Sequence, residues 1–105
     1  MMQKNKVLSM LGLARRAGKL SMGHDMAEKA VKTHKAQMVI FCSDASERLV
    51  SEFEKTIENA RAKTQIYVTD ITMAEIHFSV GYKAGVMTLD DENFSKRVIE
   101  LLKEE

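Results

Sequence analysis

The stretch MVIFC at residues 38–42 is the longest uninterrupted apolar run in the chain, and it decides the expected fold class. The run is short and contains two β-branched residues, so it predicts a β-strand whose two faces are both covered. Amphipathic segments with helical periodicity stand on either side of it, at residues 24–34 and 46–62. A buried strand between amphipathic helices is typical of an α/β protein.

The alternation of helical and strand-like segments continues along the whole sequence. The expected helices are residues 3–15, 24–34 and 46–62, a short segment after Thr72, and a last segment capped by Asp90 and Asp91. The expected strands are residues 19–22, 38–42, 66–68 and 86–89. This order predicts a three-layer α/β/α sandwich with a central four-stranded mixed sheet and helices on both faces. Strands joined by helices are expected to run parallel, while the short first strand has no predicted direction.

Residues that begin and end helices support these boundaries. Gly18 follows the first helical segment, as glycine often does at a helix C-terminus. Asp44 with Glu47, and Thr72 with Glu75, have the spacing of a capping box, in which two side chains satisfy free N–H groups at a helix start. The first pair is expected to cap the helix at 46–62, and the second pair the short helix after it.

The composition is that of an ordinary globular protein, with 45% hydrophobic and 30% charged residues in 105 positions. A chain of this length can bury one core without disulfide or metal, so we expect a single domain, residues 1–105. No apolar run approaches the ~20 residues of a membrane span, and the first residues lack the pattern of a secretory signal. The single cysteine fits a reducing compartment, so a cytoplasmic location is expected.

The formal net charge of +1 hides an uneven distribution. Residues 1–35 contain eight basic and two acidic residues, whereas residues 36–105 contain eight basic and thirteen acidic ones. A basic segment on a small domain is typical of a protein that binds a polyanion such as a nucleic acid. The alternative is a solvated helical surface that is basic without having such a partner.

The residue types that usually carry catalysis or hold metals form no recognisable constellation. Cys42 ends an apolar run with no neighbouring base, so we expect a buried, unreactive thiol. His24, His34 and His77 share no zinc-ligand spacing. The side chains of His24 and Asp25, which are adjacent on a helix, are expected to diverge. The sequence therefore predicts no catalytic residue, no metal, no cofactor and no enzymatic activity.

The segment GKLSMGHDMAEKA at residues 18–30 is the main candidate for a binding site. Gly23 stands at the entry to a helix, whose first turn offers unpaired N–H groups and a partial positive charge to an anion. Lys29 and Lys32 lie farther along the same helix and extend the site over more phosphates. The alternative is an ordinary solvated helix start, at which Asp25 interacts favourably with the helix dipole.

Three segments resemble one protein family: LGLARRAGKLSMGHDMAEKAV at residues 11–31, MVIFCSDAS at 38–46 and AEIHFSVGYKAGVMTLDDENFSKRV at 74–98. They are similar to the kink-turn RNA-binding ribosomal proteins, which include the archaeal L-seven-A-e and eukaryotic L-thirty types. The chain looks most similar to the short bacterial ribosomal-protein-like members. The resemblance covers nearly the whole chain, and it implies the same fold and an RNA site at one end of the sandwich.

The family reads tandem sheared G·A pairs of a bent RNA with a Gly-x-Asn-Glu-x-x-Lys stretch that opens its second helix. Gly23 and Lys29 match this stretch, whereas Asp25 stands in place of the asparagine and Met26 in place of the glutamate. An ionised Asp25 only accepts hydrogen bonds, whereas asparagine also donates them. Met26 has no carboxylate. The resemblance thus implies an RNA site that lacks one of the family's contacts with bases.

The family's second contact region is the loop before the last strand, here residues 79–83. The resemblance implies that Tyr82 stacks on a base and that Lys83 meets a phosphate. The expected RNA-binding residues, including a further basic rim at the end of the first helix, are Arg15, Arg16, Lys19, Gly23, His24, Asp25, Lys29, Lys32, Tyr82 and Lys83.

The sequence thus predicts a non-enzymatic protein that binds structured RNA, either ribosomal RNA or a kink-turn-like internal loop, with other ribosomal proteins as further partners. The aromatic content of 6% is low for a protein that stacks a run of single-stranded bases, so recognition of RNA shape is expected. The alternative is a protein-interaction module, as in the growth-arrest-and-DNA-damage relatives, that acts through the acidic surface of residues 36–105.

Overall fold

The helices and strands alternate as the sequence predicts. The structure, a computed structural model, describes residues 3–103, so both ends of the expected 1–105 domain lie outside the described residues. In chain order the elements are α1 (Lys4–Arg16), β1 (Leu20–Met22), α2 (His24–Lys32), β2 (Met38–Phe41), α3 (Glu47–Asn59), β3 (Gln65–Val68), α4 (Met73–Val80), β4 (Val86–Leu89) and α5 (Glu92–Lys103). None of the described helices is long and apolar enough to cross a membrane.

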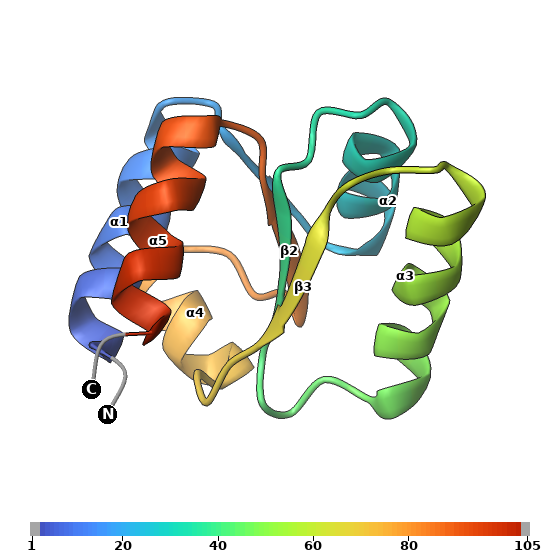
Figure 1. Cartoon of the computed structure of the whole chain (residues 1–105). Coiled ribbons are helices and arrows are strands. Elements are labelled where there is room, and N and C mark those ends of the chain that lie inside the picture. The colour runs from blue at the N-terminus through green and yellow to red at the C-terminus, as the bar shows by residue number, and fades with distance from the viewer. Residues whose placement is uncertain (1–2, 104–105) are drawn as a thin grey trace.

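Strand β2 lies at the centre of the molecule because its side chains point alternately into two apolar layers. Met38 and Ile40 belong to the layer formed with α1, α4 and α5, whereas Val39 and Phe41 belong to the layer formed with α2 and α3. Figure 1 shows these two groups of helices on opposite sides of the sheet. Helix α1 contacts both α4 and α5 within its layer. The predicted three-layer sandwich is confirmed.

The four strands form one mixed sheet in the order β1-β4-β2-β3. Strand β3 is parallel to β2, as expected for strands joined by a helix. Strand β4 pairs antiparallel with both β1 and β2. The expectation that strands joined by helices run parallel is therefore wrong for β4.

The direction of β4 follows from the position of α4, which does not carry the chain back across the sheet. The N–H of Cys42 donates to the carbonyl of Gly85 at 2.9 Å, and the N–H of Ser43 donates to the carbonyl of Ile71 at 2.9 Å. The end of β2, the segment before α4 and the start of β4 thus lie at the same end of the sheet. Because the chain enters β4 at the end where it leaves β2, the two strands run in opposite directions.

Most of the expected helix ends are confirmed. Gly18 follows α1 with a φ of 73°, the left-handed conformation that ends many helices. Thr72 and Glu75 form the capping box at the start of α4. The carboxylate of Asp91 accepts a hydrogen bond from the N–H of Phe94 at 3.0 Å, in the first turn of α5. Short-range signals in the sequence therefore set these boundaries correctly.

Two of the expected caps are wrong. Ser46, not Asp44, caps α3 by accepting a hydrogen bond from the N–H of Leu49 at 3.1 Å. Asp44 Oδ1 instead accepts from the N–H of Met73 at 3.0 Å, at the start of α4. Asp90 accepts hydrogen bonds from hydroxyl groups of β1 and β4 instead of capping α5. Asp44 thus accepts from a donor that is distant in sequence, and Asp90 accepts from one distant hydroxyl group and one local hydroxyl group.

Phe53 and Phe78 offer a matched test of the core. Phe53 is 1% exposed, whereas Phe78 on α4 is 93% exposed. The Phe53 ring meets the ring of Phe41 edge to face, with 5.6 Å between their centroids. Because Phe53→Ala leaves a cavity between α3 and the sheet, we expect the free energy of unfolding to fall by about 3–5 kcal/mol. Phe78→Ala should change it by less than about 0.5 kcal/mol in the same urea titration. Equal effects of the two substitutions would contradict the burial of Phe53.

Candidate nucleic-acid interface

Gly23 joins β1 to α2 in a backbone conformation that glycine alone adopts readily. Its φ is 89° and its ψ is 165°. Its N–H donates to the carbonyl of Val86, at the start of β4, at 2.9 Å. A Cβ at this position would lie 4.0 Å from the hydroxyl group of Tyr82. The start of α2 and the loop before β4 therefore lie against each other.

The end of α1 reaches the same loop through Arg15. Its Nη1 donates to the carbonyl of Val80 at 2.6 Å, and its guanidinium lies 5.6 Å from the centroid of the Tyr82 ring. Gly81 between them has a φ of 87°, and a Cβ there would lie 3.1 Å from Arg15 Nη1. The carbonyl and the aromatic face hold the guanidinium in place. Lys83 follows in the same loop and is exposed.

Lys29 lies along the side of α2, in a small cleft that it shares with Ser21 and Lys35. Met26, which stands where the resemblance places a glutamate, lines the same cleft and is 55% exposed. Lys35 was not among the expected site residues. Its position in the basic segment of residues 1–35 was the one signal in the sequence that pointed to it. The cleft extends the positive surface from the start of α2 toward its end.

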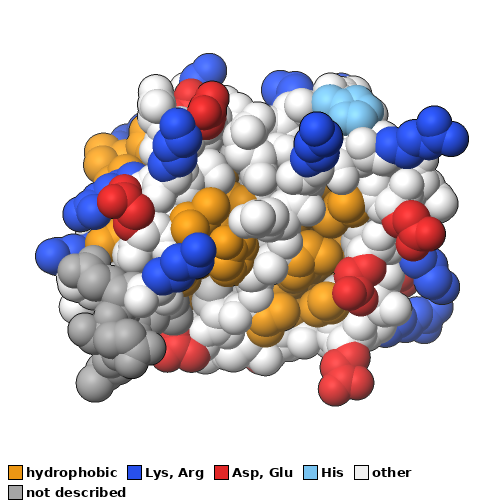
Figure 2. Space-filling model, viewed as in Figure 1, with side chains coloured by type: hydrophobic (Ala, Val, Ile, Leu, Met, Phe, Trp, Pro, Cys, Tyr) orange, Lys and Arg blue, Asp and Glu red, His pale blue; other side chains and the backbone are white. Residues whose placement is uncertain are grey.

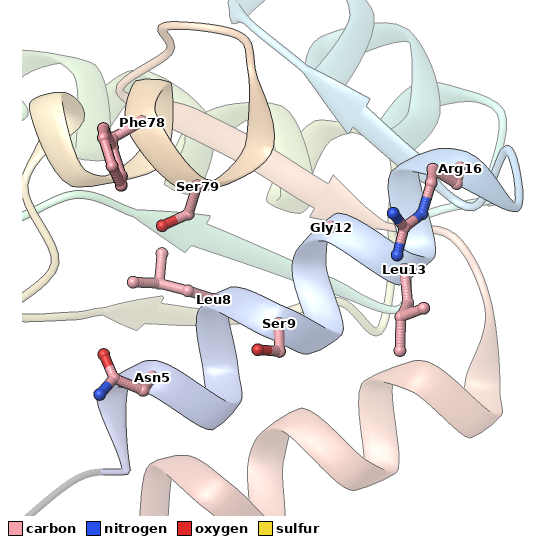
Figure 3. A pocket seen from close by; sticks show the side chains of 8 residues that line it. All are labelled: Asn5, Leu8, Ser9, Gly12, Leu13, Arg16, Phe78 and Ser79. Atoms are coloured by element: carbon pink, nitrogen blue, oxygen red, sulfur yellow. The ribbon is translucent and has the colours of Figure 1, made fainter.

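Three other expected residues lie apart from this cleft. Lys32 lies on the neighbouring side of α2, where its Nζ donates to Glu28 Oε1 at 3.3 Å. Lys19 is exposed in the turn before β1, at the opposite end of that strand from Gly23. Arg16 lines a groove of about 730 Å³ between α1 and α4. Figure 3 shows Arg16 at one end of this groove and Phe78 at the other.

His24 opens α2 and contacts two acidic side chains. Its Nδ1 lies 3.2 Å from Asp25 Oδ1, and its Nε2 lies 3.3 Å from Glu52 Oε2 on α3. The expectation that the side chains of His24 and Asp25 diverge is wrong, because the first residue of a helix has no preceding turn to restrict it. The hydrogen bond with Asp25 is the main cause that raises the pKa of His24 above 6.5; partial burial opposes it, and Glu52 adds to it.

Cys42 is buried at the end of β2, as expected, and its Sγ donates to the carbonyl of Ala84 at 3.4 Å. Burial, together with the nearby carboxylates of Asp44 and Glu75, raises the pKa of this thiol to about 11. The thiol is therefore protonated at neutral pH, a state that is a poor nucleophile. Within residues 3–103, no three His, Cys, Asp or Glu side chains are grouped so that they could hold a metal ion.

Two glycines allow a matched test of the turn at Gly23. We expect Gly23→Ala to lower the free energy of unfolding by about 1–3 kcal/mol, because alanine is strained at this φ and ψ. Gly12→Ala, in the middle of α1, should raise it by up to about 1 kcal/mol, because alanine favours the helix. The new Cβ of Gly12→Ala would lie at an ordinary 3.9 Å from the carbonyl oxygen of Ser79. Chemical denaturation measures the free energy of unfolding of both variants. A similar decrease in the two variants would contradict the described turn at Gly23.

The contacts of His24 predict how its titration responds to substitution. We expect Asp25→Asn to lower the pKa of His24 more than Glu52→Gln does, as measured by NMR of the imidazole protons. Because the folded-state pKa is raised, His24 stabilises the fold fully below 6.5, and this contribution is lost as the pH rises through the raised value. The decline of stability in that range should therefore be smaller in Asp25→Asn. An unchanged pKa in both variants would show that neither carboxylate interacts with His24.

The sequence of residues 5–98 matches the family described as Ribosomal protein L7Ae/L30e/S12e/Gadd45. The chain is 28% identical over 101 residues to the RNA-binding protein YlxQ of Enterococcus faecium, an alignment that covers 95% of this chain and 94% of that protein. The family match includes every residue of the surface formed by the start of α2, the end of α1 and the loop before β4.

Solved structures share the fold. A protein of unknown function from Bacillus halodurans is similar with a TM-score of 0.82 and 27% identity, over 94% of this chain and 98% of that one. The 15.5kD RNA binding protein of Giardia lamblia has a TM-score of 0.70 at 16% identity, over 94% of this chain and 83% of that one, which shows a common fold alone. By its sequence match over residues 5–98, the chain belongs to the Ribosomal protein L7Ae/L30e/S12e/Gadd45 family.

Proposed function

We propose that this protein binds structured RNA without catalysing a reaction, through the surface around Gly23. The observation that carries the proposal is the hydrogen bond from the N–H of Gly23 to the carbonyl of Val86. This bond places the free N–H groups at the start of α2 beside the loop that contains Tyr82 and Lys83. The relative from Enterococcus faecium, which aligns along nearly the whole chain, is named an RNA-binding protein.

The surface offers three features to a sugar-phosphate backbone. Gly23 has no side chain, so the backbone of the RNA can approach the protein closely. The first turn of α2 directs unpaired N–H groups toward it. Lys29 and Lys83, both exposed, add positive charge on either side of that turn. Together they would hold a bent RNA in register over the start of α2.

Two side chains are available for contacts with bases. Tyr82 is 48% exposed, and Arg15 fixes its ring, so a base can stack on it at low entropic cost. The carboxylate of Asp25 is fully exposed and accepts hydrogen bonds from the N1–H or amino group of a guanine. Met26 supplies apolar surface at the position where a carboxylate would accept a second bond. A kink-turn-like internal loop is the RNA that we propose.

Ribosomal RNA is the source that we propose for this internal loop, with ribosomal proteins as neighbours and the cytoplasm as the location. The family match and the basic residues of the first third of the chain support a ribosomal partner. The alternative is binding of a protein through the acidic side of α3, where Glu47, Glu54 and Glu58 are exposed. The inclusion of Gadd45 in the family description favours this candidate. Partners that remain bound after ribonuclease treatment would support it.

RNA preference and salt dependence test the proposal. We expect tighter binding to a hairpin whose internal loop contains tandem G·A pairs than to the same hairpin closed by Watson–Crick pairs. If Lys29, Lys32 and Lys83 meet phosphates, the slope of log K against log salt concentration is on the order of −2 to −3. Fluorescence anisotropy with labelled hairpins measures both quantities.

A pair of lysine variants provides the control. Lys29→Gln should weaken binding to the bent hairpin and make the salt slope shallower by about 1. Lys96→Gln removes the same charge from α5, in the other helical layer, where Lys96 pairs with Glu92 at 3.0 Å. It should leave binding unchanged. Equal affinity for both hairpins, together with a flat salt response, would overturn the proposal.

A further inference from the structure

His34 and Arg61 adopt the left-handed conformation that side chains usually avoid, with φ of 61° and 53°. Both occupy the same position, directly after the C-cap of a helix: His34 after α2 and Arg61 after α3. Helix α1 ends with the same turn but has Gly18 there, at a φ of 73°. Glycine is the residue that adopts this conformation without strain. The chain therefore keeps a strained basic residue at two of three equivalent turns.

The two strained residues face one pocket. It has a volume of about 290 Å³, and its lining includes His34, Arg61 and Lys63 together with the polar residues Gln37 and Thr64. Among the residues that the structure describes, no Asp or Glu side chain lines it. Figure 2 shows Lys and Arg side chains gathered with a histidine along the upper right edge of the molecule, over the ends of α2 and α3. A pocket lined by donors and cations, without a carboxylate, suits an anion.

Basic residues also stabilise helix C-termini by opposing the helix dipole. This explanation accounts for a positive charge near the end of α3, whose last turn contains no basic residue. It does not account for α2, whose last turn already contains Lys29 and Lys32. It also does not require the residues from two helices to line the same pocket. Strain that is retained at such a position indicates a binding role.

The segment that follows α2 connects the pocket to the surface proposed to bind RNA, because His34 lines the pocket. Lys35, next to His34, lines the cleft along α2 that also contains Lys29. Helix α2 has nine residues and so spans about 13 Å between its two ends. One double-helical arm of an RNA held at Gly23 is long enough to follow α2 to the pocket. The basic residues are thus distributed along the length of α2 and are not confined to its start.

We propose that the pocket of His34, Arg61 and Lys63 is a second phosphate-binding site, which holds the backbone of a double-helical arm of the RNA. This inference rests on the proposed function, because the RNA is anchored at the start of α2. The Arg61 guanidinium donates to phosphate oxygens in a forked geometry, and Lys63 adds a point charge. His34 and Gln37 supply further donors.

The test compares stability with RNA affinity in the same variants. Arg61→Gly should leave the thermal midpoint equal or higher, because glycine relieves the strain at this φ. It should weaken binding to the bent hairpin by roughly fivefold and make the salt slope shallower by about 1. Arg61→Lys should keep most of the affinity. Arg97→Gln, on α5 in the other helical layer, is the control that should bind like the unsubstituted protein.

Shortening the RNA separates this site from the first one. When the arm that follows α2 is truncated, Arg61→Gly and the unsubstituted protein should bind the hairpin equally. Equal affinity for the full-length hairpin would overturn the second site while the proposed function stands. Failure of the unsubstituted protein to bind any hairpin would overturn both. All binding is measured well below the thermal midpoint of each variant, so loss of the fold does not enter the comparison.

Discussion

The insertion of β4 between β1 and β2 is the constraint on which the rest of the structure depends. Because β4 is antiparallel to both neighbours, it begins where β1 ends, with Met22 opposite Met87. The hydrogen bond from Gly23 to Val86 follows directly from that register. A β4 placed beside β3 at the outer edge would separate the loop before it from α2 by two strands. Tyr82 would then lie far from Gly23, and the two segments would form no common surface.

The parts of the fold that depend on short stretches of sequence were predictable, and those that depend on distant contacts were not. The uninterrupted apolar run of residues 38–42 is visible in the sequence, and it placed β2 correctly between two layers. The direction of β4 depends on hydrogen bonds between loops that lie far apart in the chain. The role of Asp44 depends on a donor 29 residues away. No local pattern carries that information.

The residues of the candidate surface that belong to sequence motifs could be predicted. The residues that come together only through strand pairing in the sheet could not. Gly23 and Tyr82 were named from separate motifs, and the structure brings them within reach of each other. Arg61 belongs to no such motif and lies in the acidic part of the chain. It meets His34 because β2 and β3 are parallel neighbours, which sets the ends of α2 and α3 side by side. The left-handed backbone conformation of Arg61 could not be predicted from the sequence either, because glycine is the residue that usually indicates such a turn.

The two apolar layers join segments that are separated by different distances along the chain. The layer beneath α2 and α3 joins residues from Ala27 to Val86, whereas the layer beneath α1 joins residues from Val7 to Leu101. The first of these layers therefore contains no residue of α1 or α5. Helix α1, by contrast, packs against α4 and α5, the fourth and fifth of the described helices. The second layer therefore depends on contacts between segments that lie far apart in the sequence, and such contacts form more slowly during folding than local ones.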